Sequence, residues 1–211
     1  TVCELQASDI NVWTGDYNSY WANSSNWSLG HVPTSSEDVV IRDNSITCMV
    51  DVYSASCDNL DIYPGAVLRL MDETLEVMGN AYIHGELEIS DNPARLIVNG
   101  NIYWENGSTI DNHTTNDFNP EIEVYGTWDF KEGSNVQMDY GKAEIKGTGT
   151  SYIRTRSPDS YFHHIRMEKT SGGTVGHSGM STEKMYLTGN IYLDNGCTFS
   201  SYTSQTIEVD G

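Results

Sequence analysis

The sequence predicts an all-β fold, namely a right-handed parallel β-helix (solenoid) of about seven ~21-residue coils with a tryptophan-rich amino-terminal cap. Three observations predict it. A phrase of the form apolar-x-apolar-x-Gly recurs along the chain, its glycines keep a nearly constant spacing, and apolar residues alternate with polar ones between them. Alternation with a period of two is typical of a strand with one buried face.

The repeated phrase defines the coils. Its six copies end at Gly79, Gly100, Gly126, Gly147, Gly189 and Gly211, which are 21, 26, 21, 42 and 22 residues apart. The interval of 42 is therefore expected to contain one degenerate coil. An antiparallel sandwich is the rival fold, but its turns would not hold a 21-residue register.

Three of these glycines are followed by asparagine, at Asn80, Asn101 and Asn190. Asparagines at one corner of stacked coils can hydrogen-bond along the solenoid axis. We therefore expect an asparagine ladder, whereas a single Gly-Asn pair would indicate only a tight turn.

The first 55 residues lack the repeat and are expected to form the cap and the first rungs. They contain Trp13, Trp21 and Trp27, which we predict as the core of the cap, because a solenoid exposes an apolar end unless something covers it. An exposed tryptophan platform for carbohydrate is the alternative. Residues 56–211 are expected to form the solenoid, which we predict to continue beyond Gly211.

The charge excludes several classes of partner. The 211 residues include 30 acidic and 11 basic side chains, for a net charge of -19. Nucleic acid and anionic lipid are poor partners, because binding a polyanion requires Lys and Arg. No run of about 18 apolar residues occurs, so direct insertion into a membrane is not expected.

Two outward-facing rows are candidates for binding. Glu123 and Glu144 occupy the same position in consecutive coils, where a Ca²⁺ ion could relieve their repulsion; the alternative is a solvated acidic face. Tyr82, Tyr103 and Tyr192 each follow a repeat glycine by three residues. They are candidate ligand-binding residues for a sugar or a protein, or else cross-strand pairs that stabilise the sheet.

The chain has four cysteines, Cys3, Cys48, Cys57 and Cys197. Cys197 lies nearly seven coils beyond Cys57, which at ~4.8 Å per strand is too far for a disulfide. We predict a Cys48–Cys57 disulfide between neighbouring rungs, with Cys3 and Cys197 unpaired or bonded outside the chain. Buried free thiols are the alternative.

Several phrases resemble a known family. These are the segment from Trp13 through Trp27 to Asp38–Ile41, the stretch Cys57–Leu68, the repeated L-x-V-x-G-N, and Phe162–Val175. They resemble the β-solenoid regions of large secreted surface proteins of Gram-negative bacteria, especially proteins exported by the type IX route. The resemblance implies an extracellular or cell-surface location and an adhesive role.

The expected function is therefore a structural or adhesive, non-catalytic segment of a bacterial surface protein, possibly filament-forming, with other copies or further repeats as partners. A glycan-binding adhesin module is one alternative. A polysaccharide lyase or hydrolase of the β-helix type is another, and it would require two or three carboxylates within ~10 Å of each other. The blocks typical of polygalacturonases are absent from the sequence, so no catalytic residue and no cofactor other than Ca²⁺ is predicted.

Overall fold

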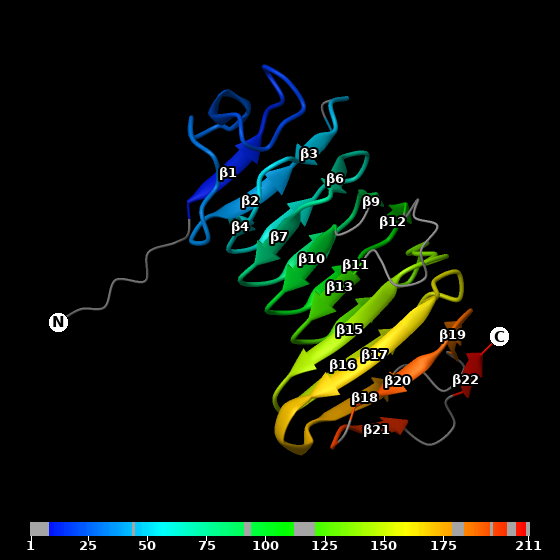
Figure 1. The fold of residues 1–211 in the computed structure, drawn as a ribbon. Coiled ribbons are helices and arrows are strands. Elements are labelled where there is room, and N and C mark those ends of the chain that lie inside the picture. Colours follow the sequence, from blue (N-terminus) through cyan, green and yellow to red (C-terminus); the bar gives the residue numbers. More distant parts are fainter. Residues whose placement is uncertain are drawn as a thin grey trace, which may run out of the picture.

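The computed structural model describes residues 9–43, 45–90, 94–111, 121–178, 184–194, 196–201 and 206–209. The chain is a parallel β-solenoid of about seven turns, which confirms the predicted fold class. Figure 1 shows the turns stacked in sequence order from the blue amino-terminal part to the red carboxy-terminal part. Within the described ranges, no helix has the length and apolar character needed to cross a membrane.

Each turn has three sides, and equivalent sides stack into sheets. Sheet A has nine strands: β1 (Ile10–Trp13), β2 (Asp38–Ile41), β5 (Leu60–Ile62), β8 (Ala81–Ile83), β11 (Ile102–Trp104), β14 (Trp128–Phe130), β16 (Thr150–Thr155), β18 (Thr174–Ser178) and β21 (Thr198–Ser201). Sheet B has seven: β4 (Ala55–Cys57), β7 (Thr74–Val77), β10 (Arg95–Val98), β13 (Glu121–Val124), β15 (Lys142–Gly147), β17 (His164–Lys169) and β20 (Ile191–Leu193).

The third side is less regular. Sheet C has four strands: β3 (Cys48–Val50), β6 (Val67–Met71), β9 (Glu86–Ser90) and β12 (Thr109–Asp111). Isolated bridges at Asn135, Gln137 and Phe162 continue this side to the two-stranded sheet D, β19 (Lys184–Leu187) and β22 (Thr206–Val209). The two short 3-10 turns are η1 (Ser24–Asn26) and η2 (Thr170–Gly172).

Parallel pairing keeps residues of one kind in rows along the axis. In sheet B, Leu75 lies opposite Leu96 and Leu96 opposite Ile122, and all three side chains are completely buried. Because alternate strand residues point to opposite faces, each apolar row fills the interior while the intervening residues face outward. The aromatic residues Trp104, Trp128, Phe130 and Phe162 fill the middle turns.

The repeat glycines allow neighbouring corners to approach closely. The Gly100 N–H donates to the Gly79 carbonyl at 2.8 Å, and a Cβ on Gly100 would lie only 2.4 Å from that oxygen. A side chain at this position would therefore push the two turns apart, which explains why glycine ends the repeated phrase.

The amino-terminal segment covers one edge of sheet A. Trp13, Trp21 and Trp27 are buried and pack edge to face, with the Trp27 ring 5.2 Å from Trp13 and 4.7 Å from Trp21. Backbone hydrogen bonds from Thr14 to Asn26 and from Ser28 to Val12 pair the outer edge of β1. An exposed tryptophan platform is therefore ruled out, since these rings lie in the interior, and the edge of β1 is protected from pairing with another strand.

The coil frame shifts after Gly147, and two predictions fail as a result. Ala143 lies opposite Ile165, and Ile165 opposite Ile191, so the phrase that ends at Gly189 belongs to the third side and not to sheet B. Asn190 consequently precedes a strand of sheet B, whereas Asn80 and Asn101 precede strands of sheet A. Asn190 is not part of the asparagine ladder, and Tyr192 does not continue the row of Tyr82 and Tyr103.

The predicted Cys48–Cys57 disulfide is also wrong. Both cysteines are buried free thiols, and burial raises the pKa of each. Cys48 lies in sheet C opposite Leu68, whereas Cys57 lies in sheet B opposite Val77, so the two face the interior from different sides. They pack as small apolar groups. Cys197 is a free thiol, and Cys3 lies outside the described residues.

Candidate functional site

One outward-facing row runs along sheet A from turn to turn. Its members are aligned by the strand register in the order Val12, Val40, Asp61, Tyr82, Tyr103, Asp129, Arg154 and Ser178. The row combines aromatic and charged side chains on one flat surface. Such a surface can bind an extended ligand.

Two of the predicted tyrosines stack in this row. The rings of Tyr82 and Tyr103 are 5.0 Å apart with an interplanar angle of 14°. The Lys131 ammonium lies 5.0 Å from the centre of the Tyr103 ring. Tyr192 lies instead in sheet B opposite Arg166. The Tyr82–Tyr103 stack is therefore a cross-strand pair that stabilises the sheet, and it also ends one wall of a groove.

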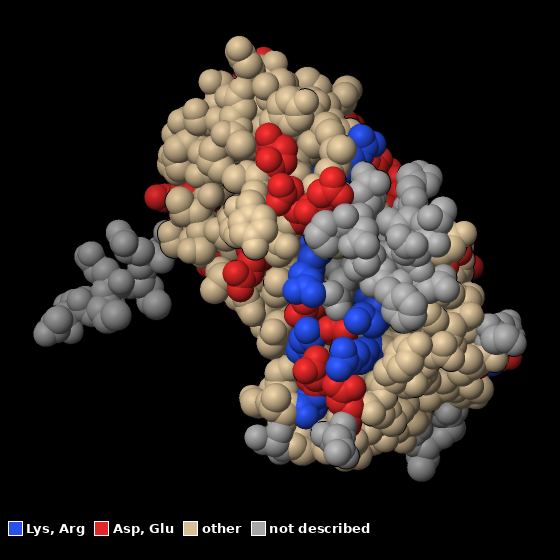
Figure 2. Space-filling view, viewed as in Figure 1, with Lys and Arg blue, Asp and Glu red and all other residues tan. Residues whose placement is uncertain are grey.

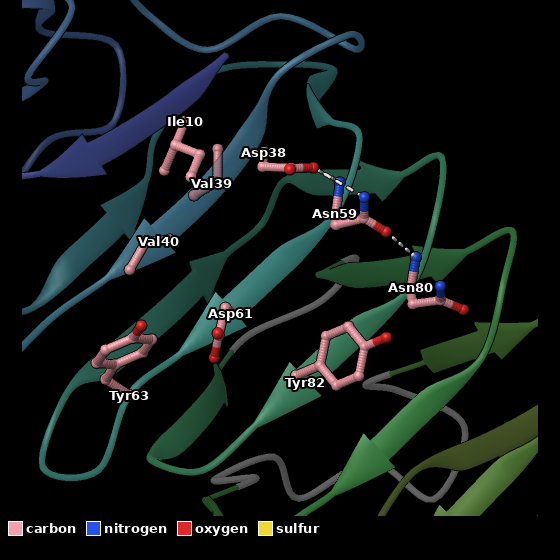
Figure 3. A pocket seen from close by; sticks show the side chains of 9 residues that line it. All are labelled: Ile10, Asp38, Val39, Val40, Asn59, Asp61, Tyr63, Asn80 and Tyr82. Atoms are coloured by element: carbon pink, nitrogen blue, oxygen red, sulfur yellow. Dashed lines mark hydrogen bonds between the residues drawn. The ribbon is translucent and has the colours of Figure 1, made fainter. Parts of the chain in front are cut away.

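The groove has a volume of about 430 Å³ and extends from Tyr82 toward the cap. It is lined by Ile10, Asp38, Val39, Val40, Asn59, Asp61, Tyr63, Asn80 and Tyr82. Figure 3 shows the Asp61 carboxylate between the rings of Tyr63 and Tyr82, with the three polar residues of the corner along one margin. A carboxylate flanked by two aromatic rings is its most distinctive feature.

Asp61 is incompletely paired. Its Oδ1 atom is buried and has no hydrogen-bond partner, and the His84 imidazole is 3.7 Å away. Burial raises the pKa of the Asp61 carboxyl above its usual value, His84 opposes this effect, and the negative charge of Glu105 adds to it. The carboxylate is thus poorly stabilised in the structure, and a cation placed beside it would gain from the interaction.

The corner beside the groove carries the ladder. Asn59 Nδ2 donates to Asp38 at 2.8 Å, the Asn80 N–H donates to Asn59 Oδ1 at 2.8 Å, and the Asn101 N–H donates to Asn80 Oδ1 at 2.9 Å. The Thr127 N–H continues it by donating to Asn101 Oδ1. Asp38 and Asn59 were not predicted, although Asn59 and Asn80 have the 21-residue spacing that identifies the row.

The far part of the row is basic. Asp129 is fully buried, and its Oδ2 atom is 2.5 Å from Arg156, 3.2 Å from Lys131 and 3.6 Å from Arg154. Three cations around one carboxylate leave a local positive charge. The outward face of sheet A is therefore acidic near the cap and basic beyond Tyr103.

The predicted acidic row of sheet B is an ion-pair network. Glu123 lies opposite Glu144, as the repeat indicates, but both are buried. Lys146 Nζ lies 2.9 Å from Glu123 and 2.7 Å from Glu144. Burial alone would lower the pKa of Lys146, but hydrogen bonds to the two carboxylates raise it well above its usual value.

This network changes the prediction for Ca²⁺. Further cations contact the pair, since Arg95 reaches Glu123 at 2.9 Å and Lys142 reaches Glu144. Figure 2 shows the interleaved blue and red side chains as a stripe over the turns. An ammonium occupies the bridging position for which we expected Ca²⁺, and neither carboxylate forms a solvated acidic face. The sequence missed this because Lys146 and Arg95 lie outside the repeated glutamate position.

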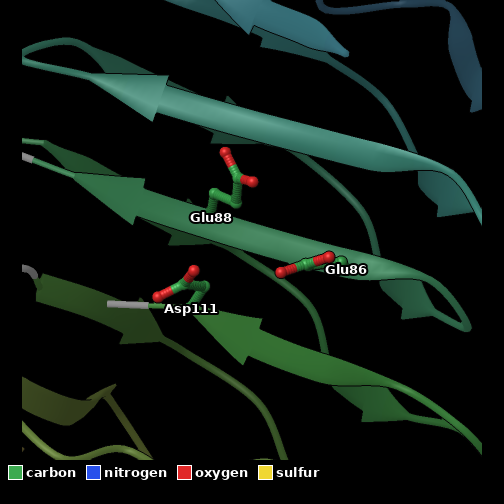
Figure 4. Close-up of side chains that lie close together, drawn as sticks. All are labelled: Glu86, Glu88 and Asp111. Carbon is green, nitrogen blue, oxygen red and sulfur yellow. The ribbon is translucent and has the colours of Figure 1, made fainter. Parts of the chain in front are cut away.

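A second acidic group lies on the outward face of sheet C. One ligand oxygen from each of Glu86, Glu88 and Asp111 lies within 4.8 Å of the others, and all three are half-buried (Figure 4). Glu88 also pairs with Arg69, and this hydrogen bond raises the pKa of the guanidinium. The repeat did not identify these residues, because the third side lacks the glycine phrase.

The fold and these surfaces define a β-solenoid repeat protein with a capped amino-terminal edge. A family model described as a domain of unknown function, DUF8693, matches residues 12–128, and the chain belongs to this family. The matched segment includes the cap, the groove and the Tyr82–Tyr103 stack. Comparisons with curated proteins and with solved structures gave no significant match.

Proposed function

We propose that the chain is a structural and adhesive, non-catalytic segment of a secreted or cell-surface protein of a Gram-negative bacterium. The continuous register of nine strands in sheet A supports this proposal, because it makes the turns a stiff scaffold that presents flat faces in fixed rows. The resemblance to type IX-exported surface proteins supports the location. The acidic surface favours solubility and opposes sheet-to-sheet association.

The proposed partners are further repeats of a longer chain or other copies of it. The inward row of sheet B supports this, since Ile165 and Met167 are fully buried whereas Leu193, in the next turn, is 52% exposed. Val209 in sheet D is 49% exposed. Covering these side chains with another rung would remove apolar surface from water.

The location is tested by labelling intact cells of the source bacterium with an antibody against the chain. Signal on intact cells or in the medium is expected, and signal only after lysis would contradict the proposal. Stacking is tested by small-angle X-ray scattering over a concentration series. The long dimension should grow while the cross-section stays constant, whereas growth of the cross-section would indicate lateral association.

Glycan binding is the second candidate function, and the groove of sheet A favours it. The groove combines an aromatic wall, apolar residues and hydrogen-bonding side chains, which is the composition of sites for amphipathic ligands. Retention of the chain on a glycan array, lost in Tyr82→Ala and kept in Tyr192→Ala, is the expected result. Tyr192 is a matched control, because it is similarly exposed but lies in sheet B.

A polysaccharide lyase or hydrolase remains a third candidate, because Glu86, Glu88 and Asp111 satisfy the spacing that such an enzyme requires. Arg69 is a poor base there, since its pKa is raised by Glu88. Incubation with pectin, alginate and chitin, with and without Ca²⁺, tests the activity. Product release that Glu88→Gln abolishes would replace the non-catalytic proposal.

A further inference from the structure

The groove beside Asp61 combines three features that together select a cationic ligand. The first is the carboxylate itself, whose buried Oδ1 has no hydrogen-bond partner. Among the described residues, the one cationic group within ion-pair distance is the His84 imidazole at 3.7 Å. A protonated amine at this position would supply the missing donor and the missing charge in one group.

The second feature is the set of aromatic rings, two of which already bind cations. The Arg42 guanidinium lies 5.7 Å from the centre of the Tyr63 ring, and Lys131 Nζ lies 5.0 Å from that of Tyr103. Tyr82 stacks on Tyr103 with one face and borders the groove. A cation beside Asp61 would therefore lie between two rings of the kind that attracts positive charge.

The third feature is the charge around the groove. Residues 1–111 contain 17 acidic and 3 basic side chains, for a net charge of -14, whereas residues 112–211 contain 13 and 8, for a net charge of -5. The groove lies in the strongly acidic half. The summed field of this half raises the local concentration of positively charged polymers and steers them toward the groove.

We propose that this groove binds amino-sugar residues of a cationic polysaccharide, with the protonated amine at Asp61 and the sugar ring against Tyr82. The inference rests on the glycan-binding candidate above. A sugar is favoured over a basic peptide because the groove has apolar surface at Ile10 and Val40 together with hydrogen-bonding groups on its margin. Successive hexoses of a β-1,4-linked chain also recur at nearly the ~4.8 Å spacing of the rungs.

The test is isothermal titration calorimetry of the full chain with a fully deacetylated glucosamine hexamer at slightly acidic pH. Three probes serve as comparisons: the N-acetylglucosamine hexamer, cellohexaose and hexalysine. Asp61→Asn and Tyr82→Ala are each expected to weaken binding of the glucosamine hexamer about tenfold or more. Tyr192→Ala, on sheet B, and Asp111→Asn, on sheet C, are expected to bind as the unchanged protein does.

The result that supports the proposal is tight binding of the glucosamine hexamer alone, with loss in the two groove variants. Thermal unfolding of each variant shows that it is folded. Equal binding of hexalysine with the same sensitivity would identify a basic peptide and overturn the proposal. Binding of the neutral sugars that Asp61→Asn leaves unchanged would overturn the charge inference and keep the glycan candidate. No binding of any sugar would overturn both and leave the structural function.

Discussion

At the scale of single residues, the interior changes character along the axis. The turns around Leu75 and Leu96 are filled by apolar side chains, whereas the later turns bury His177 and Lys169. His177 Nε2 lies 2.8 Å from Thr155 Oγ1, and Lys169 Nζ donates to the Lys146 carbonyl and to Ser151 Oγ, each at 2.5 Å. Burial lowers the pKa of both basic groups, so both favour the neutral form in the folded protein.

His177 makes the stability depend on pH. Its pKa in the folded protein lies below the usual 6.5, so below pH 6.5 the unfolded chain binds a proton that the folded chain does not. The free energy of unfolding should therefore fall by up to ~1.4 kcal/mol per pH unit as the pH drops from 6.5 to the folded-state pKa. Urea unfolding across this range is expected to show a shallower dependence in His177→Gln. Parallel curves for the two proteins would contradict this.

His31 provides a control of opposite sign. Its hydrogen bond to Glu37 raises the pKa of His31, so the pair stabilises the fold at pH values below 6.5 and loses this contribution as the pH rises through the raised pKa. His31→Gln is therefore expected to remove a stabilisation that fades toward alkaline pH. A variant that behaved like His177→Gln would show that the pH effect is not specific to the buried imidazole.

At the scale of elements, the corner ladder distinguishes two asparagines that the sequence places in one class. Asn80 Oδ1 accepts from the N–H and the side chain of Asn101, whereas the Asn190 amide is exposed and donates to Tyr192 at 3.3 Å. Asn80→Ala leaves a backbone donor unsatisfied and should cost about 1–3 kcal/mol. Asn190→Ala should cost less than about 0.5 kcal/mol. Urea unfolding measures both, and equal losses would contradict the ladder.

The ion-pair network of sheet B makes a separate prediction. Lys146→Gln leaves Glu123 and Glu144 opposite each other without their shared ammonium, which should cost about 3 kcal/mol. Adding Glu144→Gln removes the repulsion and should restore part of the stability. About 1 mM Ca²⁺ should stabilise Lys146→Gln more than the unchanged protein. Equal effects of Ca²⁺ on both would show that the carboxylates cannot replace the ammonium with a metal ion.

These elements also show how far the sequence predicts the structure. The 21-residue spacing predicts the parallel solenoid and the stack of Tyr82 on Tyr103, because an inward or outward position repeats only if each turn has the same length. The same spacing fails after Gly147, where turns of 22 and 26 residues move the glycine phrase to another side. Asp61 shares the spacing of Tyr82 and Tyr103 and was recoverable. Its poor pairing was not, since that depends on the distance to His84.

At the scale of the whole molecule, the two ends of the described solenoid differ. At the amino-terminal end, buried Trp13 and Trp27 cover sheet A, and residues 26–28 pair the outer edge of β1. In the last described turn, Leu193 and Val209 are about half exposed. Since each turn of a solenoid contacts only its neighbours, its stability depends on how well the adjacent turns are covered.

Amide hydrogen exchange should therefore decrease in protection from the middle turns toward the carboxy-terminal ones. Strands β8 and β11 lie between paired strands and under the cap, so their amides should exchange slowest, whereas those of β20, β21 and β22 should open locally and exchange fastest. Mass spectrometry of exchanged peptides measures this gradient. Trp21→Ala should raise exchange first in β1, β2 and β5, because it creates a cavity in the cap. Uniform protection, or a loss that began in β20, would show that the solenoid unfolds as one unit and that the cap does not control its amino-terminal turns.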